Sequence, residues 1–373
     1  MDNGHWFFLG LIASITNNLN TRTLRIRLLD WYHQHRRDLP WRHTRDPYRI
    51  WLSEVLLQQT RVDQGTAYYL RFLERFPSLA DLAEAKEEEV LKYWEGLGYY
   101  SRARNFHQAA RQLHREKGGA FPHDYQAWLK LKGVGPYTAA AVSSIAFAEP
   151  AAVLDGNVFR VISRLYDDPT PIDKAKSRAH FQALAQALLD ESQPGDFNQA
   201  IMELGATVCL PRRPLCSSCP WNSACQALKA GTIADRPHKT PLKPKKERFL
   251  HYLYLQRGEE IAVQRRKAGI WRGLFEFPLR EGQRVWTRED LGAQVEKDFD
   301  NPGSWRFCGQ QRLPVHLLSH QRLHLVVFNF AVPSNFTGEE QWQWLEAKAL
   351  QALAFPRPLR RFLDEKQLFL PFG

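Results

Sequence analysis

Four cysteines gathered in one short stretch are the clearest chemical signal in this sequence. Cys209, Cys216, Cys219 and Cys225 follow the spacing Cys-x6-Cys-x2-Cys-x5-Cys. A structural zinc site is usually built from two Cys-x2-Cys pairs, and here only Cys216 and Cys219 form one. Four thiolates at uneven spacing suit a cubane [4Fe–4S] cluster better. The spacing therefore favours an iron–sulfur cofactor over zinc, with four free thiols as the remaining alternative.

Two carboxylates could do acid–base or electrostatic chemistry. Glu54 lies in a run of helical periodicity, and three of its four neighbours three and four positions away are apolar. Desolvation beside such a stripe raises the pKa of a carboxyl group, which makes glutamic acid a usable general acid near neutral pH. Asp155 follows two apolar residues and opens an Asp-Gly-Asn turn. Taken alone, each has a plainer interpretation: a helix-edge glutamate whose carboxylate reaches water, and an ordinary turn aspartate.

A Gly-x-Gly turn stands immediately before a predicted helix. Gly133 and Gly135 follow an amphipathic segment that ends at Leu131, and Pro136 occupies a helix-starting position before an alanine-rich run. Glycines let backbone N–H groups approach a ligand closely, and the positive end of the following helix favours an anion such as a DNA phosphate. The pattern predicts a helix-hairpin-helix that positions the protein on DNA without reading sequence. A tight turn between packed helices is the alternative.

The elements that must position these residues change in character near residue 229. Helical stripes recur before it, and we expect Asp46 and Pro47 to cap and begin the helix that carries Glu54. Strand patterns follow at 249–255, 260–264 and 323–330. The predicted parts are an N-terminal extension at 1–21, a helical region at 22–228, a basic Pro/Lys linker at 229–247 and an α+β domain at 248–373.

Charge and cysteine usage narrow the class of partner. The chain has 373 residues and a formal net charge of +11, which favours a polyanionic partner, either nucleic acid or an acidic membrane surface. Its longest early apolar run, 6–15, is too short to cross a bilayer and lacks a preceding basic segment, so we expect no membrane partner and no secretory signal. The cysteines do not form a secreted disulfide framework, which predicts a cytoplasmic protein. Cys308 stands apart, and we expect it in the core.

Together these features resemble the helix-hairpin-helix DNA glycosylases of the endonuclease III superfamily that carry an iron–sulfur cluster. Within that superfamily the chain resembles the MutY family of adenine DNA glycosylases, and the likeness runs from about residue 22 to the end. The segments that carry it are 39–42, 53–60, 96–102 and 270–278. The resemblance implies a mostly α glycosylase fold with a [4Fe–4S] loop and a C-terminal α+β Nudix-like domain. It also implies a monomer that binds double-stranded DNA containing adenine opposite 8-oxoguanine or guanine, in the cytoplasm with the nucleoid.

The resemblance further implies roles for individual residues. Glu54 matches the general acid that protonates N7 of adenine, and Asp155 matches the carboxylate that stabilises the sugar cation. Tyr137 stands where lyase-active relatives carry a Schiff-base lysine, which implies a monofunctional glycosylase. The implied substrate contacts are Trp41, Arg42, Leu57 and Gln199 at the adenine, Gln59, Leu97 and Tyr99 around the opened base stack, and Ser319 with His320 at the 8-oxoguanine.

Two departures from the family pattern concern the C-terminal domain. Leu318 replaces the Phe of a Phe-Ser-His loop, so the aromatic contact is lost while the Ser319 hydroxyl is kept. No Gly-x5-Glu-x7-Arg-Glu-x2-Glu-Glu box is present, so we expect no Nudix hydrolysis. A glycosylase/lyase acting on oxidised pyrimidines and a non-catalytic iron–sulfur DNA-binding protein stay as alternatives. Tyr137 in place of lysine argues against the first, and the presence of both Glu54 and Asp155 argues against the second.

Overall fold

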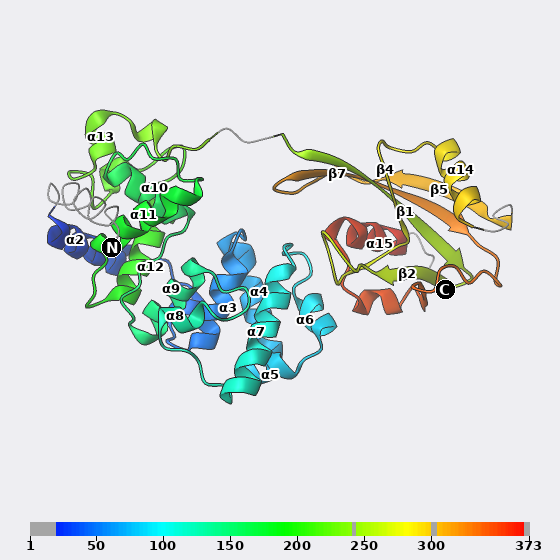
Figure 1. The fold of residues 1–373 in the computed structure, drawn as a ribbon, viewed down its shortest axis with the longest axis horizontal. Helices are drawn as coiled ribbons and strands as arrows, with labels where there is room; N and C mark the ends of the chain where they lie inside the picture. The colour runs from blue at the N-terminus through cyan, green and yellow to red at the C-terminus, as the bar shows by residue number, and fades with distance from the viewer. Residues whose placement is uncertain (1–19, 241–243, 300–303, 369–373) are drawn as a thin grey trace, which may run out of the picture. The chain divides into compact units, whose positions relative to one another are not determined.

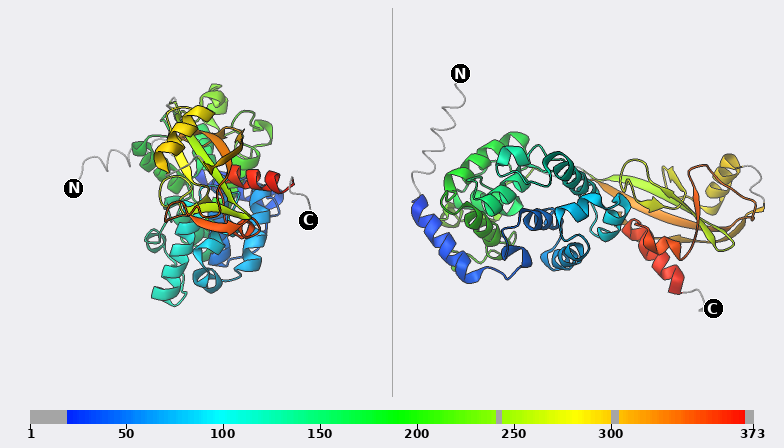
Figure 2. Two further views of the ribbon diagram at one scale, coloured as in Figure 1. Left: turned by 90° about the vertical axis from the view of Figure 1, so that its right-hand side faces the viewer. Right: turned by 90° about the horizontal axis from the view of Figure 1, so that it is seen from below.

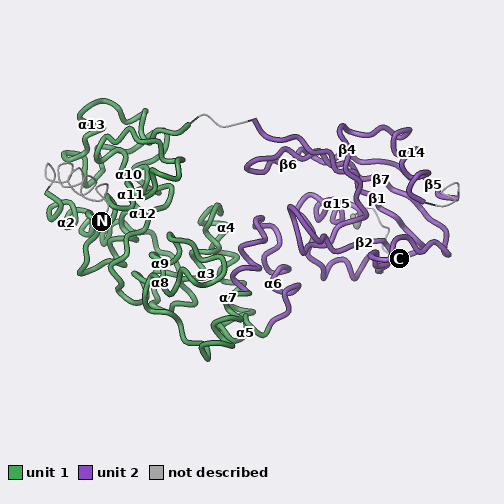
Figure 3. Tube along the Cα trace, in the orientation of Figure 1, with its two compact units in different colours: residues 1–84, 108–241 green, residues 85–107, 242–373 purple. Residues whose placement is uncertain are grey.

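The computed structural model of the chain describes residues 20–240, 244–299 and 304–368 (Figure 1). The N-terminal extension predicted at 1–21 therefore lies almost entirely outside the described residues. The chain divides into two compact units: unit 1 contains the residues up to 84 and 108–241, and unit 2 contains 85–107 and the residues from 242 onward (Figure 3). The predicted helical region thus contributes one segment, 85–107, to the second unit.

All the regular secondary structure in the described part of unit 1 is helical, as its periodicity predicts. Its elements, with α7 continuing from unit 2, are α2 (Thr21–His35), η1 (Pro40–Arg42), α3 (Pro47–Leu57), α4 (Val62–Arg75), α5 (Leu79–Glu84), α7 (Ser101–Lys117), α8 (Tyr125–Trp128), α9 (Pro136–Phe147), α10 (Gly156–Leu165), α11 (Ala175–Leu188), α12 (Pro194–Thr207), η2 (Cys216–Ser218), α13 (Gln226–Ala230) and η3 (Ile233–Asp235). Every described helix in the chain is too short or too polar to span a lipid bilayer.

Helix α3 begins where the sequence predicts. The carboxylate of Asp46 accepts a hydrogen bond from the backbone N–H of Tyr48 at 2.8 Å, and Pro47 occupies the first helical position. Eight of the nine positions from 48 to 56 are buried, including Trp51 and Leu52, because α4 and α9 pack against this short helix. A helix buried on most of its circumference has little room for a solvated side chain. Glu54 is therefore held in the interior of unit 1.

The backbone before α10 is fixed by one buried amide. Asn198 of α12 accepts a hydrogen bond from the backbone N–H of Val153 at 3.1 Å and donates to the Ser144 hydroxyl and the Ala151 carbonyl, both at 2.8 Å. These bonds satisfy polar groups that burial would otherwise leave unpaired. They also tie α9, α12 and the segment that leads into Asp155 to one another.

The first half of the predicted linker is packed on unit 1 in the structure. Residues up to 240 stay on unit 1: the buried Arg164 donates to the carbonyls of Ile233 and Arg236, and the N–H of Ile172 donates to the carbonyl of His238 at 3.0 Å. These backbone partners explain why a proline- and lysine-rich stretch is held in place. Residues 241–243 lie outside the described part of the chain, and the first strand of unit 2 already begins at Lys246.

Unit 2 is built on one mixed sheet, which confirms the predicted α+β class. The strand order is β3-β2-β1-β7-β5, with β1 and β7 parallel and the remaining pairs antiparallel. In addition, β4 pairs with β1, β6 with β7 and β8 with β2. The elements are α6 (Glu87–Tyr93), β1 (Lys246–Arg257), β2 (Glu260–Arg265), β3 (Phe275–Glu276), β4 (Leu279–Gly282), α14 (Arg288–Asp298), β5 (Arg306–Arg312), β6 (His316–Leu317), β7 (Gln321–Ala331), β8 (Gln343–Glu346), η5 (Ala349–Ala352) and α15 (Arg357–Leu368).

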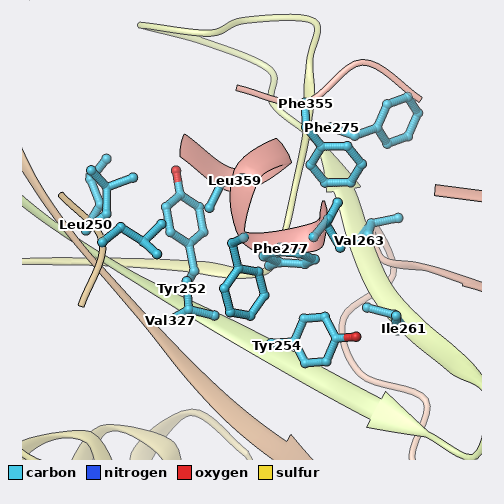
Figure 4. Close-up of a cluster of buried hydrophobic side chains, with 14 of the residues drawn as sticks. Leu250, Tyr252, Tyr254, Ile261, Val263, Phe275, Phe277, Val327, Phe355 and Leu359 are labelled. Atoms are coloured by element: carbon cyan, nitrogen blue, oxygen red, sulfur yellow. The ribbon is translucent and has the colours of Figure 1, made fainter. Parts of the chain in front are cut away.

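Alternation along β1 supplies two hydrophobic clusters, one on each face of the sheet. Tyr252 and Tyr254 point into a cluster that α15 covers (Figure 4). Leu253 and Leu255 point into the opposite cluster, which contains Leu291 of α14. Two further views of the ribbon show α14 and α15 on opposite sides of the sheet (Figure 2). A strand with apolar side chains on both faces is the pattern of a central strand covered by helices.

Cys308 is exposed, so the prediction that it belongs to the core is wrong. Strand β5 alternates between exposed and half-buried residues along its whole length. Phe307 takes the inward position, and Cys308 therefore projects outward, because successive side chains in a strand point to opposite faces.

The segment 85–107 joins unit 2 through charged groups. The carboxylate of Glu95 accepts hydrogen bonds from the backbone N–H of Phe355 at 3.0 Å and from Arg360 at 2.9 Å. Arg265 bridges Glu87 and Glu88 at 3.2 and 2.9 Å. Such pairs join residues far apart in the sequence, which is why periodicity and composition do not reveal them.

Candidate active site

The carboxyl group of Glu54 is buried on α3 and hydrogen-bonded to a tyrosine from α9. Glu54 is 8 % exposed, and the hydroxyl of Tyr137 donates to its Oε2 atom at 2.6 Å. Burial raises the pKa of Glu54 from 4.5 to about 7; the Tyr137 hydrogen bond and Arg42 oppose the rise, and Asp155 adds to it. A carboxyl group with this pKa is part protonated near neutral pH and can donate a proton.

Asp155 is the N-cap of α10, as its place before the predicted helix suggests. Its carboxylate accepts hydrogen bonds from the backbone N–H of Val158 at 2.7 Å and from the side-chain amide of Asn157 at 2.9 Å. Burial raises the pKa of Asp155, and these two hydrogen bonds act against the rise because they favour the ionised form. The two carboxyl groups therefore meet different environments: Asp155 has two N–H donors and a helix N-terminus, and Glu54 has a single hydroxyl donor.

One cavity of about 770 Å³ in unit 1 contains both carboxylates. Several residues that the sequence analysis proposed separately meet on its walls, from η1, α3, the α9 turn and α12. The predicted residues that line it are Trp41, Arg42, Glu54, Leu57, Gln59, Gly133, Gly135, Tyr137, Asp155 and Gln199. The predicted residues Leu97, Tyr99, Ser319 and His320 belong to unit 2.

The Gly-x-Gly turn has the geometry that an anion site needs. Gly133 has a φ of +77°, in the left-handed region where a side chain is strained. Gly135 is the N-cap of α9 and supplies no side-chain cap, and Pro136 follows at the first helical position. The N–H groups of the first turn of α9 therefore keep their capacity to bind an external acceptor, and the helix end favours negative charge.

Glu203 of α12 is a residue of this cavity that the sequence analysis missed. It is 1 % exposed, and its carboxylate accepts hydrogen bonds from Arg42 at 2.6 Å and from the Arg37 side chain at 2.7 and 2.8 Å. Burial alone raises the pKa of Glu203, but the hydrogen bonds from the two arginines outweigh it and lower that pKa to about 2. The available signal was a glutamate inside the apolar run 200–205, where a charge needs a partner.

A buried arginine connects the turn of Asp155 with the cysteine loop. Arg160 donates to the Asn157 amide oxygen at 2.9 Å, to the Cys209 carbonyl at 2.7 Å and to the Gly205 carbonyl at 2.6 Å. A Cβ atom at Gly205 would stand 2.6 Å from the side chain of Asn157, so only glycine permits this approach of α12 to α10.

The four cysteines line one small pocket with apolar walls, without any disulfide between them. Arg164 approaches the Sγ atom of Cys209 at 3.4 Å and donates to the carbonyl of Leu210 at 2.7 Å, and the indole of Trp221 donates to the Leu24 carbonyl, which fixes the loop on α2. No His, Asp or Glu among the described residues lines this pocket. Among the described residues, no three or more Cys, His, Asp or Glu side chains stand in an arrangement that could hold a metal ion. Four thiols are the donor set of iron–sulfur and other soft-metal chemistry, so the residues fit such a group.

A second cavity, of about 450 Å³, lies within unit 2 and is lined by the other four predicted residues, Leu97, Tyr99, Ser319 and His320. The hydroxyl groups of Tyr99 and Ser319 are hydrogen-bonded at 2.5 Å. Tyr99 has a φ of +48°, which is strained for a residue with a side chain and is typical of functional sites. Leu318 packs against the core cluster under α15, so the leucine in place of phenylalanine serves there as a core contact.

Two family models match separate stretches of the chain. Residues 52–187 match the HhH-GPD superfamily of base excision DNA repair proteins, and residues 251–365 match the NUDIX domain. The solved structure of a thermostable thymine-DNA glycosylase is 31% identical, with a TM-score of 0.52, over 58% of this chain and 99% of that chain. The fold and the helix-hairpin-helix site thus define a DNA glycosylase, an enzyme that hydrolyses N-glycosyl bonds.

Sequence comparison with similar proteins identifies the family of this chain. The adenine DNA glycosylase of Mus musculus is 39% identical over 92% of this chain and 78% of its own length. The adenine DNA glycosylase of Buchnera aphidicola subsp. Baizongia pistaciae is 30% identical over 92% of this chain and 96% of its own length. The chain belongs to the adenine DNA glycosylase family, whose members typically carry a [4Fe–4S] cluster.

The buried carboxyl group of Glu54 predicts a pH-dependent stability effect. Because its pKa rises from 4.5 to about 7 on folding, the folded state binds more protons between these values, and its stability falls as pH rises through that window. Glu54→Gln removes this loss, so it should stabilise the protein at pH 8 by about 3 kcal/mol more than at pH 4. The measurement is the free energy of unfolding in urea across this pH range.

The control is Glu74→Gln, at an exposed position of α4, where the side chain is solvated in the folded protein. If the gain from Glu54→Gln is the same at every pH, the Glu54 carboxyl group is not desolvated in the folded protein.

Proposed function

We propose that this protein removes adenine that stands opposite 8-oxoguanine or guanine in double-stranded DNA, by hydrolysis of the N-glycosidic bond. The observation that carries the proposal is the buried Glu54, which has a pKa of about 7, receives a hydrogen bond from Tyr137 and shares one cavity with Asp155. Membership of the adenine DNA glycosylase family supports adenine as the base.

Adenine inside a duplex cannot be reached, so it is flipped out at a cost of roughly a few kcal/mol. The cavity of about 770 Å³ offers an apolar and aromatic wall from Trp41 and Leu57 and polar groups from Arg42 and Gln199. This combination suits a nucleobase, which presents flat faces and a polar edge. The amide donors at the start of α9, which no side chain caps, offer a place for a backbone phosphate.

Glu54 and Asp155 divide the chemistry between them. Protonation of adenine at N7 by Glu54 allows the C1′–N9 bond to break, with its electron pair leaving on the base. The positive charge that develops on the sugar is stabilised by the carboxylate of Asp155. Water then adds at C1′ and loses a proton, which completes the hydrolysis. The division requires a protonated Glu54 beside an ionised Asp155, and their different hydrogen-bond donors act in that direction.

The same cavity favours a monofunctional glycosylase. No lysine lines it among the described residues, so no amine is present to form a Schiff base. Burial raises the pKa of Tyr137 well above 10, so its hydroxyl stays protonated and serves as a hydrogen-bond donor to Glu54. These features disfavour the alternative, a glycosylase/lyase that acts on oxidised pyrimidines.

Unit 2 is proposed to read the base opposite adenine. The hydroxyl of Ser319 can bond to the edge of 8-oxoguanine, whose N7–H and C8 carbonyl distinguish it from guanine. His320 and Leu97 line the same cavity, and Tyr99 and Gln59 are proposed to enter the opened base stack. Both have φ values near +50 to +60°, a conformation that exposed turn residues can use to project a side chain.

We also propose that Cys209, Cys216, Cys219 and Cys225 hold a [4Fe–4S] cluster. When bound, such a cluster cross-links its loop and supplies a one-electron redox centre. Arg164 fixes the loop backbone, and the exposed Arg212 between the first two cysteines adds positive charge toward a polyanion. The protein is proposed to act as a monomer on DNA in the cytoplasm, in keeping with its net charge of +11.

The first prediction of this proposal concerns the two carboxylates. Glu54→Gln keeps the size and hydrogen bonding of the side chain but removes the acidic proton, so it should bind an A:8-oxoguanine duplex as the unchanged protein does and release no adenine. Asp155→Asn should lower the single-turnover rate by at least about a hundredfold, because the sugar cation loses its counter-charge. The rate is read as strand cleavage that appears only after alkali.

A Glu54→Gln protein that releases adenine at a near-normal single-turnover rate would remove Glu54 from the mechanism. Duplexes that carry thymine glycol serve as the matched test of the alternative substrate class.

A second prediction concerns lesion reading. Ser319→Ala should reduce the preference for adenine opposite 8-oxoguanine over adenine opposite guanine by about tenfold, because one hydrogen bond of roughly 1–3 kcal/mol is lost. The measurement is the ratio of single-turnover rates on the two duplexes. Ser334→Ala, at an exposed position of the same unit, is the control, and an equal ratio in all three proteins would place lesion reading elsewhere.

A third prediction concerns the cofactor. Protein purified without oxygen should be brown and contain about four iron atoms per chain, and Cys219→Ser should lose most of the iron. Cys308→Ser, at the exposed cysteine of unit 2, should retain it. Stoichiometric zinc without iron in the unchanged protein would contradict the proposed cluster.

A further inference from the structure

Glu203 holds two arginines at the wall of the cavity that contains Glu54. Its carboxylate accepts four hydrogen bonds, from the backbone N–H, Nε and Nη2 of Arg37 and from Nη2 of Arg42, at distances of 2.6 to 3.0 Å. The side chain of Arg42 is 9 % exposed, whereas that of Arg37 is 38 % exposed and partly solvated. A buried guanidinium without a counter-charge is costly, so Glu203 fixes where Arg42 stands.

The charge of Arg42 acts on Glu54. Arg42 is the cation whose attraction opposes the burial of Glu54 and favours its ionised form. A general acid loses its function when it ionises, so an unbalanced cation at this wall acts against the reaction. The titratable and charged groups that line the cavity from all its elements are Glu54, Arg37, Arg42, Tyr137, Asp155, Arg178 and Glu203.

The net charge of the groups that line the cavity depends on Glu203. Arg37, Arg42 and Arg178 bring three positive charges, and Asp155 and Glu203 bring two negative ones when ionised. Of the two carboxylates, only Glu203 bonds to Arg42, and it remains ionised across the physiological pH range because its pKa is about 2. Asp155 is engaged by Val158 and Asn157 and makes no hydrogen bond to Arg37 or Arg42.

We propose that Glu203 is a positioning residue for adenine removal: it holds Arg42 on the cavity wall and offsets its positive charge, so that Glu54 keeps the proton it delivers. This inference rests on the proposed function and extends it to a residue that does not touch the reacting atoms. It also assigns Arg37 a role, since Arg37 orients the Glu203 carboxylate from the rim of the cavity.

The test is the pH profile of single-turnover adenine release from an A:8-oxoguanine duplex by the full-length protein. The rate should fall as pH rises through the pKa of Glu54, near 7 in the unchanged protein. In Glu203→Gln the midpoint of this fall should move down by about one pH unit, because Arg42 is no longer balanced. The rate at pH 5 should then exceed the rate at pH 8 by about a hundredfold in the variant, against about tenfold in the unchanged protein.

Three comparisons separate charge from shape. Glu203→Asp keeps the negative charge and should keep the midpoint, even if its overall rate is lower. Arg42→Gln removes the positive charge and should move the midpoint upward. Glu191→Gln, at an exposed position before α12, should change neither the rate nor the midpoint. A Glu203→Gln protein that is slower at every pH with an unmoved midpoint overturns the proposal and leaves Glu203 a purely structural residue.

The free energy of unfolding tests the same inference without catalysis, which matters if a variant is inactive. The stabilisation that Glu54→Gln gives at pH 8 should be smaller in a Glu203→Gln background, because the pH window over which Glu54 titrates is narrower there. An equal stabilisation in both backgrounds overturns the inference. Absence of adenine release by the unchanged protein at every pH contradicts the proposed function instead, while this unfolding comparison still decides the role of Glu203.

Discussion

Burial of the Glu54 carboxyl group is the constraint around which unit 1 is arranged. Helix α3 is buried on nearly all sides, and a carboxyl group there loses the water that would stabilise its charge. The single hydroxyl of Tyr137 replaces part of that water. The result is a group that keeps its proton to about pH 7, at the expense of stability at higher pH. Because nearby charges shift the pKa of such a group, each of them must be balanced by a partner.

The surrounding polar groups meet that need by pairing with one another. Asp155 takes its donors from the first turn of α10, and Glu203 takes the guanidinium groups of Arg37 and Arg42. Arg160 bonds to backbone carbonyls and to Asn157, so its charge is fixed by neutral partners. Few charges are therefore left without a partner beside Glu54, and the cavity can hold one protonated and one ionised carboxyl group.

In unit 2 the segment 85–107 has a functional consequence. Glu95, Glu87 and Glu88 attach it to the C-terminal domain, and it carries Tyr99 to within hydrogen-bond distance of Ser319. Tyr99, one of the two residues proposed to enter the base stack, and Ser319, proposed to read the lesion, thus belong to one compact unit. Their relative positions are set by packing within that unit, which suits two side chains that must act on neighbouring bases.

The sequence alone determined the features that depend on local spacing. Capping, glycine conformation and periodicity act within a few residues. They account for the helix capped by Asp46, the Gly133–Gly135 turn, the cap at Asp155 and the central strands of unit 2. Resemblance to a family added candidate roles, and eight of those residues meet in one cavity.

Tertiary structure alone decided which distant residues share an environment. The pairing of Glu203 with Arg37 and Arg42 joins positions more than 160 apart in the sequence, and local pattern carries no information about it. The outward position of Cys308 was decided by the register of an edge strand, since a shift of one residue exchanges the two faces. The pKa of Glu54 was likewise decided by burial between α4 and α9, because desolvation depends on what packs around a group and not on its neighbours in the chain.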